Sequence, residues 1–303
     1  MSTFLAITFS GVALGAVYFL IASGLSLIYG LMEVLNFAHG AFMVVGAYCG
    51  WALAAYLPHA VPSALRFCIA LGGAAAGAAL FAALTEMLLI RRLYGRVTSQ
   101  ILVTVGLDLA VVALLYGIFT SNSRLIAVPA WLLGVTHAGS VALVNADLVA
   151  LGAGISVLVL LGVLLSRTRY GLVIRAGAEN REMVGALGID VRRAFTVVFT
   201  FGGAAAGLAG LLYSVVFSGD LVAPGEGDTL LIFAFIVVVI GGLGSIAGSA
   251  VAALLVGLVQ DYVNFYVGSH SGLAQLGNIS IVVLLVLVIE LRPRGLLGRR
   301  AFA

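Results

Sequence analysis

The sequence contains no lysine, because all 15 of its basic residues are arginines. A phosphate-binding P-loop requires a lysine, and so does Schiff-base chemistry. This chain therefore does neither. Any work that it draws from ATP must be done by an ATPase on a different chain.

Cysteine is scarce, and the familiar catalytic patterns are missing. Cys49 and Cys68 lie in or beside apolar runs, which favours small packing residues over a disulfide or a metal pair. There is no HExxH motif, no pair of aspartates within an apolar run, and no Ser/Lys or Ser/His pair placed for catalysis. We therefore expect no catalytic residue, no cofactor and no metal, and an intramembrane enzyme is disfavoured.

Charge is also scarce: 9% of the residues are charged, 63% are hydrophobic, and the mean hydropathy is +1.22. A soluble domain does not bury such a large apolar fraction. Backbone groups in lipid must be satisfied within their own segment, so long apolar runs indicate helices. The sequence predicts an all-α, polytopic helical membrane protein with no nucleic-acid partner.

Apolar runs predict about eight or nine transmembrane segments in a single domain that covers residues 1–303. The N-terminus has no basic residue of the kind that precedes a cleaved signal peptide, so it is interpreted as the start of the first segment. The expected segments are 6–30, 37–57, 65–90, 100–119, 147–166, 194–218, 228–243, 248–267 and 275–291.

Arginines predict the orientation of these segments. Three arginines lie in 91–96, six in 167–193 and four in 292–300. The positive-inside rule places all three regions in the cytoplasm. With nine segments the N-terminus then lies outside, and it would lie inside if one run does not span. The longest outer loop, about 120–146, is either a lid anchored by Trp131 or a passive connection.

Glycine is abundant, with 39 residues. Small-xxx-small spacings let helix backbones approach closely, although they are common in any tight bundle. The first four segments and the last four would be inverted relative to each other if the chain contains a duplication, as in many transporters. The spacings occur at Gly11/Gly15, Gly73/Gly77, Gly203/Gly207 and Gly244/Gly248.

The stretch "LMEVLNFAHG" places polar residues between two apolar runs. Polar groups are expensive in hydrocarbon, so Glu33, Asn36 and His39 should face protein or water. Gly30 and Gly40 permit a break in the helix. The stretch is interpreted either as a broken helix beside a translocation path or as an ordinary polar turn.

Asp108 lies deep within the run "QILVTVGLDLAVVALLYGIF". An acid at that depth requires a partner or an aqueous cavity, so it is either a structural hydrogen-bonding group or a path-lining group. Glu86 and Glu290 lie near arginines and are interpreted as interfacial. The acidic turn "PGEGDT", residues 224–229, is expected on the outer side and is most simply solvated.

The cytoplasmic segment 167–193 is too polar to span a membrane. Within it, "LVIRAGAENREMVGAL" predicts one or two short helices with an apolar stripe at Leu172, Ala176, Met183 and Leu187. Such a helix docks in a groove of a cytosolic protein, or it lies on anionic lipid. Farther along, "GGLGS" predicts a glycine-rich hinge or tight-packing turn.

Three blocks and their order resemble the membrane permeases of branched-chain amino acid ABC importers. The blocks are "GLSLIYGLMEVLNFAHGAFMVVGAY", "AENREMVGALGID" and "VVVIGGLGSIAGSAVAALLVG", and "RPRGLLG" also fits. The resemblance extends from about residue 8 to 298, and "NFAHG" and "GGLGS" are its specific parts. Many members have an acidic residue after the glycine of "NFAHG", where this chain has Ala41, so the solute stays open.

The resemblance implies a type II-like permease with several passes through a bacterial inner membrane. It implies partners: a sister permease or a second copy, two cytosolic ABC ATPase subunits, a periplasmic binding protein and membrane lipid. It implies uptake of branched-chain or other hydrophobic amino acids, with urea or short amides as the alternative. A stand-alone secondary carrier is less favoured, because Asp108 is the one deep acid expected.

These interpretations assign residues to three roles. The expected translocation-path residues are Glu33, Asn36, Phe37, His39, Gly40 and Asp108. The expected ATPase-coupling residues, implied by the resemblance, are Arg175, Glu179, Asn180, Arg181, Met183, Gly185, Leu187, Gly188 and Asp190. The expected hinge residues are Gly241, Gly242, Gly244 and Ser245.

Overall fold

The computed structural model describes residues 2–32, 35–58, 60–139, 141–179, 191–268 and 276–298. Most of this chain is helical. The helices are α1 (Ser2–Met32), α2 (His39–Tyr56), α3 (Ser63–Leu88), η1 (Ile90–Leu93), α4 (Val97–Phe119), α5 (Asn145–Arg167), α6 (Arg169–Glu179), α8 (Val191–Val216), α9 (Glu226–Gly241), α10 (Ile246–Val263), η2 (Asn264–Gly268) and α12 (Leu276–Leu291).

Each predicted transmembrane segment corresponds to one of the long helices: α1 to α5, α8, α9, α10 and α12. Within the described ranges, six helices are long and apolar enough to cross a membrane: α1, α3 with η1, α4, α5, α8 and α10 with η2. The others are shorter, and α2 and α9 have only 18 and 16 residues. The helical membrane fold is confirmed, and two of its short helices lie at the centre.

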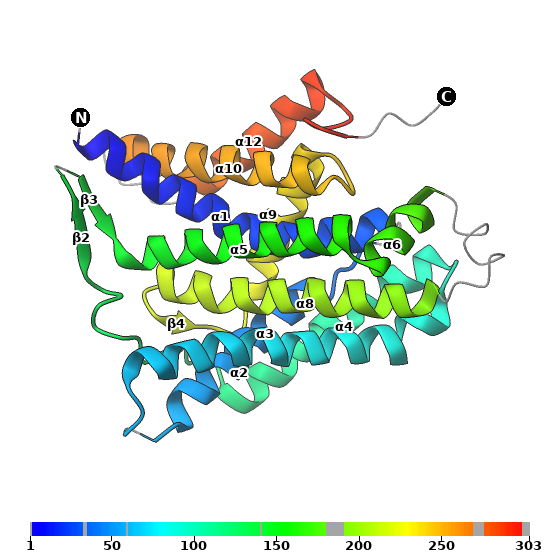
Figure 1. Ribbon diagram of the computed structural model, residues 1–303, viewed down its shortest axis with the longest axis horizontal. Coiled ribbons are helices and arrows are strands. Elements are labelled where there is room, and N and C mark those ends of the chain that lie inside the picture. The colour runs from blue at the N-terminus through cyan, green and yellow to red at the C-terminus, as the bar shows by residue number, and fades with distance from the viewer. Residues whose placement is uncertain are drawn as a thin grey trace.

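The long helices run along the long axis of the molecule (Figure 1). The N-terminus and the antiparallel hairpin of β2 (Val135–Ala138) and β3 (Val141–Val144) lie at one end, called here the hairpin end. Helix α6 lies at the opposite end, called here the α6 end. The two longest polar loops therefore lie at opposite ends, as the arginine distribution predicts. The hairpin forms the later part of the segment 120–146, and Trp131, just before it, is 49% exposed, so the anchored lid stays a prediction.

A second small sheet joins two connections at the hairpin end. Strand β1 (Arg124–Leu125), which follows α4, pairs antiparallel with β4 (Leu221–Val222), which follows α8. The loop between α8 and α9 is thereby tied to the loop after α4. This pairing fixes where the chain turns back to start α9.

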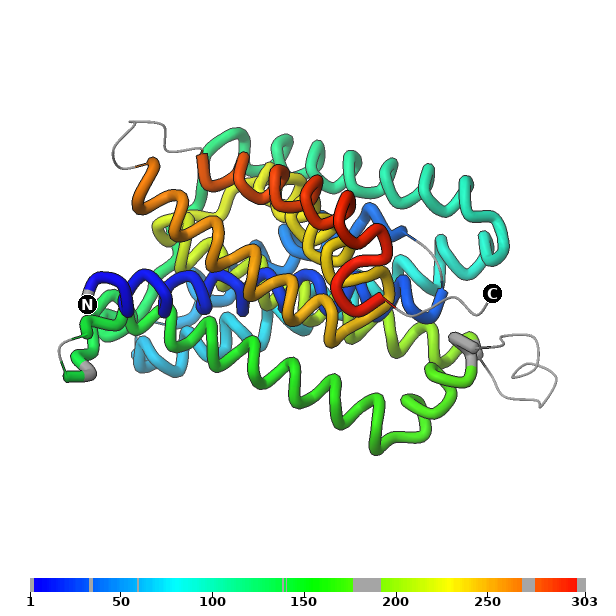
Figure 2. Tube along the Cα trace, turned by 90° about the horizontal axis from the view of Figure 1, so that it is seen from above, coloured from blue at the N-terminus to red at the C-terminus, as the bar shows by residue number. Residues whose placement is uncertain are grey.

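Of the six helices long and apolar enough to cross a membrane, α1 and α8 are the most buried, whereas α4 and α5 are the most exposed. Figure 2 shows α4 and α5 on opposite sides, with α1 between them. Helix α1 packs most extensively on α10, and α3 packs equally extensively on α8. If α1 to α4 correspond in order to α8, α9, α10 and α12, then the contact of α1 with α10 is equivalent to the contact of α8 with α3. The packing therefore agrees with the expected inverted repeat.

Glycines set the spacing between the central helices. An alanine Cβ at Gly207 would lie 2.3 Å from the Cβ of Ala78 and 2.5 Å from the Ala74 carbonyl oxygen. Gly207 also faces Gly46 of α2, whose own Cβ would lie 2.3 Å from the Gly207 Cα. In lipid, this kind of close backbone packing replaces the hydrophobic effect as the force between helices.

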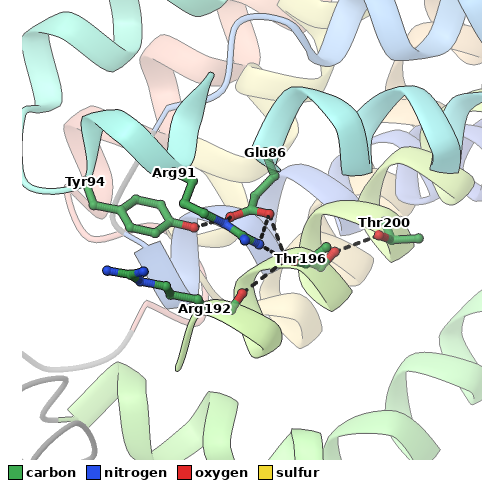
Figure 3. A network of polar contacts seen from close by, with 6 residues as sticks. All are labelled: Glu86, Arg91, Tyr94, Arg192, Thr196 and Thr200. Carbon is green, nitrogen blue, oxygen red and sulfur yellow. Dashed lines mark hydrogen bonds and ion pairs between the residues drawn. The ribbon is translucent and has the colours of Figure 1, made fainter. Parts of the chain in front are cut away.

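A buried polar cluster joins α3 and η1 to the start of α8 (Figure 3). Glu86 is fully buried, and it receives the Arg91 guanidinium at 3.1 Å and the Thr196 hydroxyl at 2.7 Å. Tyr94 donates a short hydrogen bond to the same carboxylate. Arg91 also donates to Thr196 at 2.8 Å. The predicted proximity of Glu86 to arginine is confirmed, but the carboxylate is a buried anchor, and Glu290 is exposed.

We expect Gly207→Ala to lower the free energy of unfolding by about 1–3 kcal/mol, because the added methyl group overpacks the contact with α3. The matched control is Gly106→Ala on α4, where an added Cβ meets nothing within 4 Å. Thermal unfolding of the purified chain in detergent measures both changes. Equal melting temperatures for the two variants would contradict the close-packing account.

We expect Arg91→Gln to destabilise the α6 end by about 2–3 kcal/mol, because it leaves the buried Glu86 carboxylate without its counter-charge. Arg92→Gln makes the same change at the neighbouring exposed arginine and should have little effect. Hydrogen exchange at the start of α8 reports the local loosening. Similar protection in both variants would show that the ion pair contributes nothing there.

Candidate functional site

The helix break predicted from "NFAHG" is present. Helix α1 ends at Met32, and residues 35–38, which are not helical, lead into the start of α2 at His39. Asn36 is fully buried and stabilises the turn, because its side-chain oxygen accepts from the Ala38 amide at 3.2 Å and its carbonyl accepts from the His39 amide at 3.3 Å. Glu33 lies outside the described residues. The break is therefore an ordered turn within the protein.

His39 fixes the start of α2 to the middle of α1. Its Nε2 lies 3.0 Å from the Ile21 carbonyl oxygen. Since a carbonyl only accepts, Nε2 carries the proton and Nδ1 is left as an acceptor. Within the described structure, His39 Nδ1 and Asn36 Nδ2 are buried and have no hydrogen-bond partner. Both side chains are surrounded by protein, so their predicted contact with the path stays a prediction.

Helices α2 and α9 meet at their N-terminal ends. An added Cβ at Gly40 would lie 3.0 Å from the Gly227 carbonyl oxygen, and one at Gly227 would lie 2.6 Å from the Gly40 carbonyl oxygen. Both positions therefore require glycine. Phe37, just before α2, also contacts Phe235 of α9, with ring centroids 5.0 Å apart. The positive ends of two helix dipoles converge here.

Two carboxyl groups face this meeting point. Asp108 is the middle residue of α4 and is 7% exposed. Its Oδ1 lies 3.0 Å from where a Gly40 Cβ would be, and its carboxyl group interacts with the Ala41 amide at the start of α2. Asp228, in the first turn of α9, lies close enough to interact with Asp108 and is itself exposed. One carboxyl is thus buried beside the helix ends and the other is open to the surface.

The role of α9 is what the sequence analysis missed. The acidic turn at residues 224–229 was expected to be solvated outside, but Glu226 begins α9 and Gly227 is buried against α2. Glu226 accepts a hydrogen bond from Ser214 of α8 at 2.9 Å. The sequence does contain a pattern that predicts this helix start, because proline, glycine and two acidic residues before an apolar run are typical of a helix N-terminus.

This arrangement offers partners for a zwitterion at half the length of the bundle. Amide N–H groups at a helix N-terminus attract a carboxylate, and a carboxylate side chain attracts an ammonium. Gly40, Gly227, Asp108 and Asp228 bring both kinds of group together. Of these four residues Asp228 is exposed, and Gly40, Gly227 and Asp108 are buried behind it.

The segment predicted to couple to an ATPase begins with α6. Arg175 is exposed and Glu179 ends the helix. Ile174 is the buried apolar residue, whereas Leu172, placed in the predicted stripe, is 62% exposed. The other expected coupling residues, Asn180, Arg181, Met183, Gly185, Leu187, Gly188 and Asp190, lie outside the described residues.

The predicted hinge is a tight turn between α9 and α10. Gly242 and Gly244 have φ angles of +101° and +77°, which disfavour residues with a Cβ. Ser245 caps α10 by accepting the Gly248 amide at 3.1 Å. Gly241 packs so closely on Gly248 that an added Cβ would lie 2.5 Å from the Gly248 carbonyl carbon. The turn is well packed, and its movement stays a prediction.

Comparisons with known proteins agree with this architecture. Residues 7–291 match the family described as branched-chain amino acid transport system / permease component. The chain is 29% identical to the high-affinity branched-chain amino acid transport system permease protein LivH of Salmonella typhimurium, over 98% of this chain and 96% of that protein. It is 29% identical to the permease protein BraD of Pseudomonas aeruginosa, named for the same transport system, over 96% and 94%.

A permease from a third organism is also similar over most of its length. The probable branched-chain amino acid transport permease protein LivH of Methanocaldococcus jannaschii is 28% identical over 92% of this chain and 88% of that protein. No solved structure gives a significant match. With the family matched over nearly the whole chain, this protein belongs to the permease components of branched-chain amino acid transport systems, and it is a multi-pass membrane permease subunit of an importer, not an enzyme.

Proposed function

We propose that this chain is the membrane subunit of an ATP-driven importer for branched-chain or other hydrophobic amino acids in a bacterial inner membrane. One structural observation supports amino acids as the solute. Asp108 and Asp228 lie beside the meeting N-termini of α2 and α9, where a zwitterion finds a partner for each of its charged groups. The names of the similar permeases support the same solute class.

The translocation path in this proposal runs past the exposed side of α9. In this proposal the ammonium group of the solute pairs with Asp228 and Asp108, and its carboxylate meets the helix end at Gly40. Asn36 and His39 hold the break in position from within the protein. Glu33 and Phe37 complete the segment that borders the path.

The proposed partners are a sister permease or a second copy, two cytosolic ABC ATPase subunits, a periplasmic binding protein and membrane lipid. The absence of lysine supports a separate ATPase, because the chain has no P-loop of its own. The ATPase contact is assigned to residues from Arg175 in α6 through Asp190. The turn from Gly241 to Ser245 is assigned the role of hinge.

Urea or short amides are the second candidate solutes. They are neutral, so they give two carboxyl groups no charge to pair with. The Asp108–Asp228 neighbourhood therefore favours amino acids. Uptake of labelled leucine into vesicles, in competition with excess valine or excess acetamide, separates the two classes.

We expect Asp108→Asn to reduce leucine uptake by about 10- to 100-fold, because a hydrogen bond to a charged group contributes roughly 1.5–3 kcal/mol. The matched control is Asp147→Asn, which changes an equally buried aspartate at the start of α5. Uptake is measured with the ATPase and binding protein present, and basal ATP hydrolysis should persist in both variants. Unchanged uptake in Asp108→Asn would remove this residue from the path.

The ATPase contact is tested by co-purification. We expect a P-loop ATPase to co-purify from detergent with the intact chain and not with a chain whose residues 180–190 are replaced by a Gly/Ser linker of equal length. The control replaces the β2–β3 hairpin, residues 135–144, at the opposite end. If no ATPase is retained by the intact chain, a stand-alone secondary carrier becomes the better explanation.

A further inference from the structure

A cavity of about 270 Å³ lies at the α6 end, apart from the site between α2 and α9. It is a partly open cavity, bordered by α1, the end of α5, α6 and the turn that leads into α10. Its lining includes both an expected coupling residue, Arg175, and expected hinge residues, Gly244 and Ser245. The remaining lining residues are Ser26, Leu27, Gly30, Leu165, Ile174, Ile246 and Ala247.

Ser26 is a buried hydroxyl that lacks a partner. Serines within helices usually donate to a carbonyl in the preceding turn. Ser23, one turn earlier in α1, does so, because its hydroxyl donates to the Leu20 carbonyl at 2.9 Å. Ser26 is also fully buried, but its hydroxyl has no hydrogen-bond partner in the described structure. A hydroxyl of this kind on a cavity wall is available to hydrogen-bond a polar ligand.

The start of α10 contributes free donors to the same wall. The first amide N–H groups of a helix have no partner inside the helix. Here the Ser245 amide donates to the Gly242 carbonyl and the Gly248 amide donates to the Ser245 hydroxyl. Two donors of the first turn are left, the amides of Ile246 and Ala247, and both residues line the cavity.

The positive groups on the cavity wall favour an anionic ligand. Arg175 brings a guanidinium, and the N-terminus of α10 brings the positive end of a helix dipole. Among the described residues that line the cavity there is no aspartate or glutamate, so an ammonium group would have no counter-charge there. This cavity therefore differs in sign from the site beside Asp108 and Asp228.

The rest of the wall is apolar. Leu27, Leu165 and Ile174 come from three different helices and face the same space. They suit a small hydrocarbon group next to the charged end of a ligand. A fully hydrated inorganic ion would leave these side chains without a partner.

We propose that this cavity binds an oxyanion attached to an apolar body, with the oxyanion held by Arg175, the Ser26 hydroxyl and the first turn of α10. The oxyanion has two possible sources. One is a free branched carboxylate in the cytoplasm, and the other is the phosphate of an anionic lipid headgroup. In either case the ligand links α6 to the turn between α9 and α10.

A regulatory consequence rests on the proposed function, although binding itself does not. If α6 leads into the ATPase contact and the turn at Gly244 is the hinge, an occupied cavity holds the two together. The bound anion would then oppose the movement of α6 that accompanies ATP binding. Transport would respond to the anion from the α6 end.

The experiment measures binding to the full-length purified chain alone, in nanodiscs, without ATPase or transport. In the first arm the discs contain only zwitterionic lipid, and 4-methylpentanoate is titrated by saturation-transfer NMR. In the second arm the discs contain a fraction of phosphatidylglycerol, and native mass spectrometry counts the anionic lipid that stays bound. Saturable binding in the first arm identifies a free carboxylate, and retention in the second identifies a lipid.

Two variants and two matched controls locate the binding. We expect Arg175→Gln to weaken binding about tenfold and Ser26→Ala to weaken it severalfold. Arg169→Gln changes an arginine of α6 that does not line the cavity, and Ser23→Ala removes the hydroxyl that already has a partner. Arg175 is exposed and Ser26→Ala removes a single unpaired oxygen, so both variants should fold.

The outcome is decisive in both directions. Binding that falls in Arg175→Gln and Ser26→Ala but not in the controls supports the site. Absence of binding in both arms, or equal losses in the two controls, overturns it. Since the assay contains no ATPase and no transported amino acid, its failure is distinct from a failure of the proposed import function.

Discussion

Close contact between glycine backbones at the centre of the bundle is the constraint on which the rest of the structure depends. Gly46 of α2 packs on Gly207 of α8, and Gly40 packs on Gly227 of α9. In a bilayer there is no hydrophobic force between helices, so such packing is what holds the centre together. It also brings the starts of two short helices beside Asp108. The polar site is therefore a consequence of how closely the helices pack.

The same packing makes the helix break possible. Irregular backbone survives at membrane depth only where protein or an aqueous cavity satisfies its polar groups. Here Asn36 supplies the local hydrogen bonds, and His39 connects the start of α2 to the Ile21 carbonyl. These buried side chains hold the first turn of α2 against Gly227 of α9 and beside Asp108 of α4. Asn36 and His39 therefore serve mainly to position the backbone at the start of α2.

The sequence predicted the helices well, because an apolar run in lipid has one stable backbone conformation. It also predicted the break, since Asn36 and His39 cannot face hydrocarbon. It did not reveal the partnership of Asp108 with Asp228, because the two residues lie far apart in the chain and no local pattern links α4 to the start of α9. Likewise, helical periodicity placed Leu172 in a stripe, whereas the packing against α1 and α5 buries Ile174 instead. Tertiary contacts of this kind leave no local pattern.

At the α6 end, α6 and α8 flank the segment that we propose contacts the ATPase. Residues 180–190 connect α6 to α8, and the described helix on each side of them is attached to a different part of the bundle. The start of α8 is fixed to α3 through Thr196 and Glu86. Helix α6 borders the cavity that it shares with α1 and the start of α10. Helix α3 belongs to the first half of the expected inverted repeat, whereas the cavity beside α6 is bordered by α1 of the first half and by α10 of the second. The connecting segment is therefore joined, through α6 on one side and α8 on the other, to helices of both halves.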